Sequence, residues 1–121
     1  FPYTTLFRSV DGRADAHGET IVRIRVRDAG LPFEPQAYVP GVGYLDGKIG
    51  SRLFVEVDGL QHAEEWSGPG ASSFERDHDR DILTYLATGA RTIRITYRQL
   101  ETFWPQCLAA ILRAYEEQRD V

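Results

Sequence analysis

Hydrophobic and polar residues alternate over two short runs near the middle of the chain, from Val42 to Ile49 and from Leu53 to Asp58. In the second run Leu53, Val55 and Val57 fall on one side of an extended backbone, and the residues between them fall on the other. Such alternation is typical of β-strands, and the glycine and serine between the runs favour a turn. The two runs therefore predict a β-hairpin.

The apolar residues of segment 18–30 fit the spacing of a strand and also that of a helix. Three β-branched residues between positions 22 and 26 alternate with arginines, which is typical of a strand. The same apolar residues also fit helical spacing, and Gly30 followed by Pro32 favours the end of a helix. The pattern leaves both structures open, and we prefer the helix.

The remaining elements are a short extended segment from Pro35 to Pro40, a helix from about Phe74 to Thr88, a strand from Thr92 to Tyr97 and a helix from Pro105 to Tyr115. The first of these helices carries one stripe made of Phe74, His78, Ile82 and Leu86. The chain thus reads helix, three strands, helix, strand, helix. This order predicts a small α/β sandwich with a mixed sheet, in which consecutive strands pair antiparallel and the last strand returns parallel through a crossover.

Composition narrows the class of protein. The 121 residues include 42% apolar and 26% charged side chains, which is ordinary for one folded domain. A single cysteine excludes a disulfide framework and a multi-cysteine zinc site, and it fits a cytoplasmic protein. No apolar run approaches the roughly 18 residues of a membrane span, so no membrane partner is expected. The net charge of −4 argues against nucleic-acid binding through bulk positive charge, but not against a nuclease whose site is a carboxylate cluster.

Residues 1–9 have no regular period and no signal-peptide pattern. Their sequence resembles translated sequencing-adapter read-through. We therefore expect a non-native or disordered leader at residues 1–9, followed by a single domain over residues 10–121.

Acidic residues gather on the predicted hairpin, with Asp46 on its first strand, Glu56 and Asp58 on its second, and His62 just past a glycine. Crowded carboxylates raise one another's pKa. A hard divalent cation removes that cost, and Mg²⁺ is typically held by one or two carboxylates together with water and substrate phosphate. Acids also occur on the solvent-facing side of ordinary antiparallel sheets, so the pattern alone leaves both interpretations open.

A shared metal site would fix the register of the hairpin. Asp46 and Glu56 lie directly opposite each other only if Ile49 pairs with Leu53, which leaves residues 50–52 as the loop. A shift of one residue would place the two acids on opposite faces of the sheet. We predict the register that keeps them together.

The ordered segments Asp46…Glu56-Val-Asp58-Gly…His62, Phe74-x-x-Asp77-x-x-Arg80-Asp81 and Ile93-Arg-Ile-Thr-Tyr-Arg-Gln99 together resemble the very-short-patch-repair-endonuclease-like domain of the PD-(D/E)xK nuclease superfamily. The resemblance covers roughly residues 18–114. It implies a restriction-endonuclease-like αβββαβα sandwich with a mixed central sheet, and it favours the helix for residues 18–30. In related bacterial proteins the domain often follows an AbiEi-antitoxin-like winged helix, which would lie upstream of this chain.

The resemblance also implies a catalytic set, carried over residue by residue. Asp46 and Glu56 match the two acidic ligands of Mg²⁺ or Mn²⁺, and Glu19 matches a first-helix glutamate that faces the active site. An acid at position 19 also suits the start of a helix without any catalytic role.

Asp58 is included in the catalytic set, although it stands where the superfamily usually has a lysine that activates the attacking water. His62 then becomes the candidate for proton transfer, and Asp77 matches an aspartate that could orient its imidazole. Lys48, the only lysine, is a weaker replacement for the missing one, because it follows Asp46 on the same face.

The function implied is that of a metal-dependent DNA endonuclease or nickase that hydrolyses phosphodiester bonds, with DNA as its partner. One alternative is a non-catalytic endonuclease-like binding module of an antitoxin-type regulator, since a fold does not guarantee activity. A third, weaker alternative is a nuclease that acts on RNA or on structured ends. If the first interpretation holds, the acids should meet in one cleft, and at least one should have a raised pKa.

Overall fold

The computed structural model describes residues 14–58 and 73–119, so the predicted leader and His62 lie outside the described residues. In chain order the elements are α2 (Ala14–Asp28), β1 (Glu34–Val39), β2 (Gly43–Lys48), β3 (Leu53–Asp58), α4 (Ser73–Thr88), β4 (Arg91–Thr96), α5 (Tyr97–Thr102) and α6 (Trp104–Arg119). The first described element is a helix, as preferred, and the predicted order of helices and strands is confirmed except for one additional helix, α5.

The four strands form one mixed sheet in the order β1-β2-β3-β4. β1 pairs antiparallel with β2 and β2 with β3, whereas β4 returns parallel to β3 after α4. Gly47 pairs with Val55, and the Ile49 N–H donates to the Leu53 carbonyl at 2.8 Å. The predicted hairpin register is therefore confirmed.

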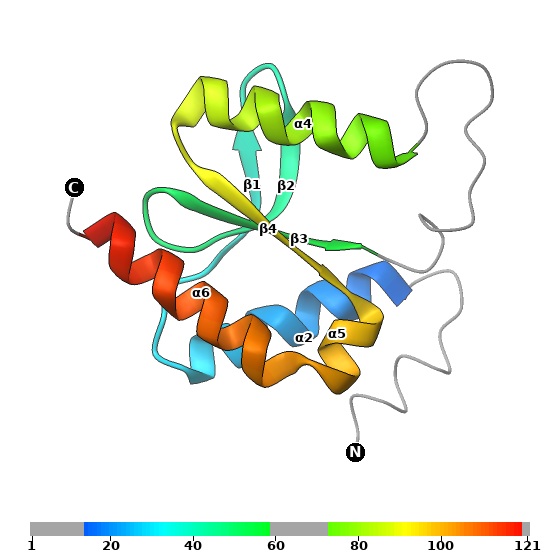
Figure 1. The fold of residues 1–121 in the computed structure, drawn as a ribbon, viewed down its shortest axis with the longest axis vertical. Helices are drawn as coiled ribbons and strands as arrows, with labels where there is room; N and C mark the ends of the chain where they lie inside the picture. Colours follow the sequence, from blue (N-terminus) through cyan, green and yellow to red (C-terminus); the bar gives the residue numbers. More distant parts are fainter. Residues whose placement is uncertain (1–13, 59–72, 120–121) are drawn as a thin grey trace.

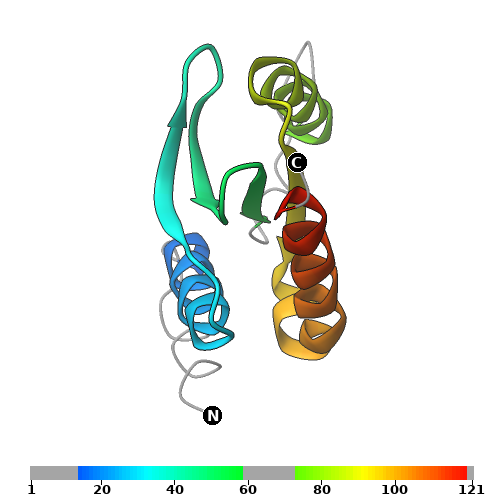
Figure 2. The same cartoon turned by 90° about the vertical axis from the view of Figure 1, so that its left-hand side faces the viewer.

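The sheet separates two layers of helices (Figure 1). α4 lies on one side of it, and α2, α5 and α6 lie on the other, as the view in Figure 2 also shows. The larger core lies between the sheet and this second layer, where buried aliphatic residues from β3 meet those of α2 and α6. These include Val22 and Val26 of α2, Leu53 and Val55 of β3, and Ile111 of α6.

α4 covers the opposite face with a small apolar contact. The cluster on that face contains Phe54 and four smaller residues of the strands and their connections, and Thr84 is the fully buried residue of α4. The stripe predicted from Phe74 to Leu86 points away from the sheet: Phe74, Ile82 and Leu86 are 69%, 67% and 79% exposed. The inner side of α4 instead carries charged residues, and their partners are described below.

Helix α5 was not predicted, because the strand period continues into Tyr97. Thr96 ends the strand and caps the helix: its Oγ1 accepts from the Gln99 N–H, and the Gln99 Oε1 accepts from the Thr96 N–H at 2.9 Å. This reciprocal capping supplies partners for the backbone where the chain turns from β4 into α5.

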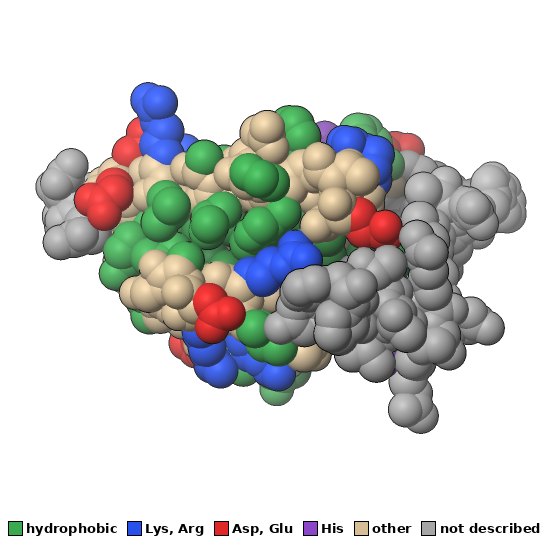
Figure 3. Space-filling view, turned by 90° about the horizontal axis from the view of Figure 1, so that it is seen from below, with side chains coloured by type: hydrophobic (Ala, Val, Ile, Leu, Met, Phe, Trp, Pro, Cys, Tyr) green, Lys and Arg blue, Asp and Glu red, His purple; other side chains and the backbone are tan. Residues whose placement is uncertain are grey.

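Figure 3 shows the side of the molecule that carries α2, α5 and α6. Hydrophobic side chains form a band across this side, and charged side chains lie mainly along its borders. Among the described residues, no helix combines the length and apolar character needed to cross a membrane.

Gly47 lies against the ring of Phe33, and a Cβ atom at position 47 would overlap with that ring. Because Phe33 is buried in the larger core, Gly47→Ala should lower the free energy of unfolding by roughly 1–3 kcal/mol. Urea denaturation measures this change. Phe33→Leu in the same chain should recover part of the loss, whereas simple addition of the two losses would contradict the contact.

Candidate functional site

β2 and β3 separate where Asp46 faces Glu56. The Asp46 N–H donates to Glu56 Oε2 at 3.0 Å, and the Val57 N–H donates to Asp46 Oδ2 at 2.7 Å. Carboxylate oxygens thus accept the backbone N–H groups beyond the last ladder pair, which joins Gly47 to Val55. Each acid is held by the backbone of the opposite strand, so the two carboxyls are fixed relative to each other.

Glu19 of α2 reaches the same place, because its carboxyl lines one pocket with those of Asp46 and Glu56 and interacts with that of Asp46. Gln36 of β1 donates from Nε2 to Glu19 Oε1 at 2.9 Å. Its φ of 51° lies in the left-handed region, which residues other than glycine rarely adopt. Such strain is often found at functional sites, and here it occurs in a residue that orients an acid.

The pKa of Glu56 is raised to about 8, first by burial and then by the Asp46 carboxyl, whereas the hydrogen bond from the Asp46 N–H and the charge of Arg80 lower it. Burial also raises the pKa of Glu19 to about 8, again with contributions from Asp46. The expectation of an acid with a raised pKa is confirmed. The three carboxyls repel one another as anions, so the site favours either a proton or a cation.

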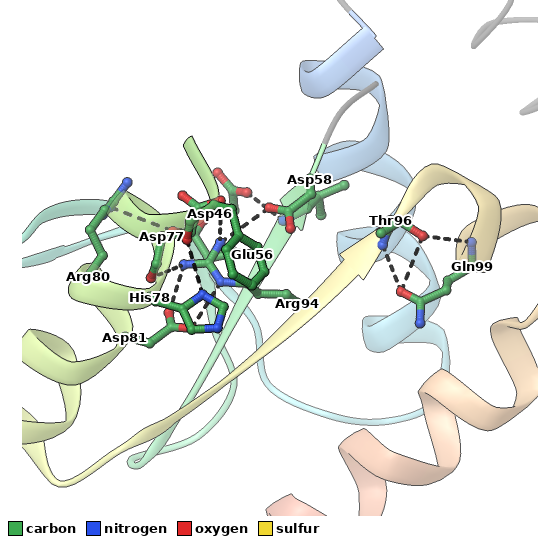
Figure 4. A network of polar contacts seen from close by, with 12 residues as sticks. Asp46, Glu56, Asp58, Asp77, His78, Arg80, Asp81, Arg94, Thr96 and Gln99 are labelled. Atoms are coloured by element: carbon green, nitrogen blue, oxygen red, sulfur yellow. Dashed lines mark hydrogen bonds and ion pairs between the residues drawn. The ribbon is translucent and has the colours of Figure 1, made fainter. Parts of the chain in front are cut away.

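A second cluster of charged side chains lies beside the first and is centred on Arg94 of β4. Its Nη2 donates to Asp81 Oδ1 at 2.7 Å, and its Nη1 lies 3.2 Å from Asp58 Oδ1 and 3.6 Å from Asp77 Oδ2. Burial opposes the charge of Arg94, but its hydrogen bond with Asp81 and the charges of the three aspartates hold its pKa above the ordinary value. Figure 4 shows these side chains converging from β3, α4 and β4.

In this cluster Asp58 and Asp77 make a contact that the sequence did not indicate. Both pair with Arg94, which is 18% exposed. The predicted contact between Asp77 and His62 lies outside the described residues. Lys48 lies with its Nζ 5.8 Å from the centre of the Phe54 ring.

One open pocket joins the two clusters. Its lining includes every residue of the predicted catalytic set within the described ranges, namely Glu19, Asp46, Glu56, Asp58 and Asp77. Four further residues line it, namely Tyr44, Val57, Arg80 and Arg94. The predicted convergence of the acids in one cleft is therefore observed.

Arg80 and Tyr44 were not assigned to the site from the sequence. Arg80 Nη2 lies 3.6 Å from Glu56 Oε1 and donates to the Tyr44 carbonyl at 2.8 Å, and its side chain is 37% exposed. Its spacing of three residues from Asp77 was visible in the sequence, since residues three apart share a helical face. No such signal marked Gln36 or Tyr44.

Across residues 14–58 and 73–119, no three His, Cys, Asp or Glu side chains form a ready-made set of metal ligands. Asp46 and Glu56 nevertheless provide the two carboxylates that suffice for Mg²⁺, whose remaining ligands are usually water and substrate phosphate. The chain matches no family model, and no curated protein or solved structure matches it.

Proposed function

We propose that the chain is a metal-dependent DNA endonuclease or nickase of the PD-(D/E)xK type. The proposal rests on one observation: Asp46, Glu56 and Glu19 place their carboxyls together in an open pocket, and burial and mutual repulsion raise the pKa of both glutamates. Arg80 does form an ion pair with Glu56, with its Nη2 3.6 Å from Glu56 Oε1, but the pKa of Glu56 stays raised despite this charge.

The donor set fits Mg²⁺ or Mn²⁺, because all three groups are hard oxygen ligands and their repulsion is relieved by a divalent charge. Asp46 and Glu56 would hold the ion, and Glu19 would complete the surrounding shell. When bound, such an ion supplies a water nucleophile at neutral pH and stabilises negative charge on the phosphoryl group.

The protein's own residues then have distinct tasks. The backbone bonds of Asp46 and Glu56 keep their carboxyls in place before any ligand arrives. Arg80 is placed to contact a phosphate oxygen beside them. Arg94 positions α4, and with it Arg80, through Asp77 and Asp81, and it balances the charge of Asp58 at the place of the usual lysine.

The proposal is tested by incubating the purified chain with supercoiled plasmid in Mg²⁺, Mn²⁺ or EDTA. We expect nicked or linear plasmid with either metal and none with EDTA. Titration calorimetry with Mg²⁺ provides an independent measurement. Metal binding without cleavage of any DNA or RNA would instead favour a non-catalytic binding module of an antitoxin-type regulator.

The variant Gln36→Gly removes the backbone strain at position 36 together with the hydrogen bond to Glu19, so it shows which of the two matters for stability and which for cleavage. Glycine adopts a φ near 51° without the ~1–2 kcal/mol penalty of other residues, but it loses backbone entropy on folding worth about 0.5–1 kcal/mol. We expect a free energy of unfolding within about 1 kcal/mol of the wild type, and cleavage reduced roughly tenfold because Glu19 loses a hydrogen bond. Gln36→Asn should behave similarly. Unchanged cleavage by both variants would show that Gln36 does not position Glu19.

A further inference from the structure

Two exposed tyrosines pair across β1 and β2, and one of them, Tyr44, belongs to the pocket lining. Tyr38 and Tyr44 face each other across β1 and β2, with ring centroids 5.1 Å apart and ring planes tilted by 59°. They are 60% and 64% exposed, and Tyr44 also lines the carboxylate pocket. The Tyr44 carbonyl accepts from Arg80, which links this aromatic pair to the guanidinium beside Glu56.

The geometry of the pair limits what it can hold. A planar ring inserted between two others needs them parallel and about 6.8 Å apart, which is twice the 3.4 Å rise of stacked bases. At 5.1 Å and 59° the two tyrosines leave no such gap. A ligand ring can therefore stack only on the outer face of one tyrosine. The second tyrosine contacts that tyrosine ring on its other side.

Because the pocket is lined by charged residues, an uncharged contact is well suited to hold the substrate there. Five acids and two arginines line the pocket, so without a cation its surroundings repel a phosphate backbone. Stacking on an aromatic face does not depend on that charge and accepts any base. A base on the tyrosines would hold a strand at the pocket while its phosphate lies near Arg80 and the acids.

We infer that the Tyr38–Tyr44 pair is a stacking platform for an unpaired base of the substrate strand, an inference that rests on the proposed nuclease function. A base inside a duplex has both faces covered by its neighbours, so only an unstacked base can use the platform. The substrate class is therefore single-stranded DNA, or DNA with an unpaired nucleotide beside the bond that is cut.

A cross-strand tyrosine pair also stabilises a hairpin by itself, and the test must separate the two roles. The variants are Tyr44→Leu and Tyr38→Leu, which keep an apolar side chain on the strand, and Tyr44→Phe, which keeps the ring. Tyr85→Leu is the matched control, because Tyr85 is also 64% exposed but lies on α4 beside a different pocket. Thermal unfolding of each variant shows whether the hairpin is intact.

The measurement is single-turnover cleavage of dye-labelled oligonucleotides in Mg²⁺, at protein concentrations below saturation. A single strand is compared with its duplex, and an abasic nucleotide is moved along the strand past the cleaved bond. We expect preference for the single strand and a loss of roughly 5- to 150-fold for Tyr44→Leu, with little loss for Tyr44→Phe or Tyr85→Leu. At one abasic position the loss should equal that of Tyr44→Leu, and combining the two should add nothing further.

Two results would overturn the platform while leaving the nuclease intact: equal cleavage of single strand and duplex, or wild-type cleavage by Tyr44→Leu and Tyr38→Leu. Cleavage of an RNA strand with the same dependence on Tyr44 supports the platform and changes the polymer assigned to the site. If nothing is cut, the nuclease proposal fails. Fluorescence anisotropy with the same strands then decides whether the tyrosine pair binds an unpaired base. Binding of the single strand that Tyr44→Leu weakens supports it, and equal or absent binding overturns it.

Discussion

Asp46→Ala should abolish metal-dependent cleavage rather than reduce it by a small factor. Asp46 contributes one of the two proposed ligands, and its Oδ2 also accepts from the Val57 N–H at the point where β2 and β3 separate. Its loss removes the ion together with its charge stabilisation, so the rate should fall by at least about 10³-fold. Plasmid nicking in Mg²⁺ measures the rate, and calorimetry should show that Mg²⁺ binding is lost.

Controls distinguish loss of the ion from loss of the fold. Asp79→Ala removes an exposed aspartate from α4 and should cleave like the wild type. Asp46→Ala combined with Glu56→Ala should be little worse than either variant alone, because the two acids act as a unit. Residual Mg²⁺-dependent cleavage by the double variant would show that these acids do not hold the metal.

The hairpin and its acids could be predicted because their pattern is local. Strand alternation and the glycine-serine turn indicated the hairpin, and the requirement that Asp46 and Glu56 share a metal selected the register, which the structure confirms. The local pattern did not show that the ladder ends there. That feature depends on side-chain oxygens competing with carbonyls for the Asp46 and Val57 N–H groups.

The orientation of α4 could not be predicted from its own residues. Its apolar stripe favours burial, yet Phe74, Ile82 and Leu86 face outward. Burying that stripe would turn Asp77 and Asp81 away from Arg94, which is largely buried on β4 and needs acidic partners. The ion-pair cluster is therefore a physical reason for the observed orientation, and it joins residues that are distant in sequence.

Gln36 and Tyr44 illustrate the same limit at the site. Neither belongs to a motif, and each matters only because the β1–β2 pair brings it beside α2 or α4. Gln36 reaches Glu19 across 17 positions, and the Tyr44 carbonyl reaches Arg80 across 36. Contacts of this kind follow from the assembled sheet, whereas the acids could be identified from spacing and family resemblance.

The metal-free protein should lose stability as the pH rises, and Glu56→Gln should remove much of that loss. The pKa of Glu56 is about 8 in the folded chain, compared with 4.5 for an ordinary glutamate. The folded state therefore binds more protons than the unfolded state between these values, so its advantage is complete below about pH 4.5 and disappears as the pH rises through about 8.

Glutamine stays neutral and can still accept from the Asp46 N–H, so in EDTA at about pH 9 Glu56→Gln should unfold later than the wild type. Because Glu56 is only 6% exposed, we expect a gain on the order of 2–4 kcal/mol, or roughly 5–15 °C in Tm. Glu34→Gln, which changes an exposed glutamate of β1, should have no comparable effect. Mg²⁺ should stabilise the wild type at this pH and leave Glu56→Gln nearly unchanged, because a ligand stabilises only the form that binds it. A wild-type Tm that stays constant from about pH 5 to pH 9 in EDTA would contradict a buried, repelled Glu56, and with it the main physical reason for a cation at this site.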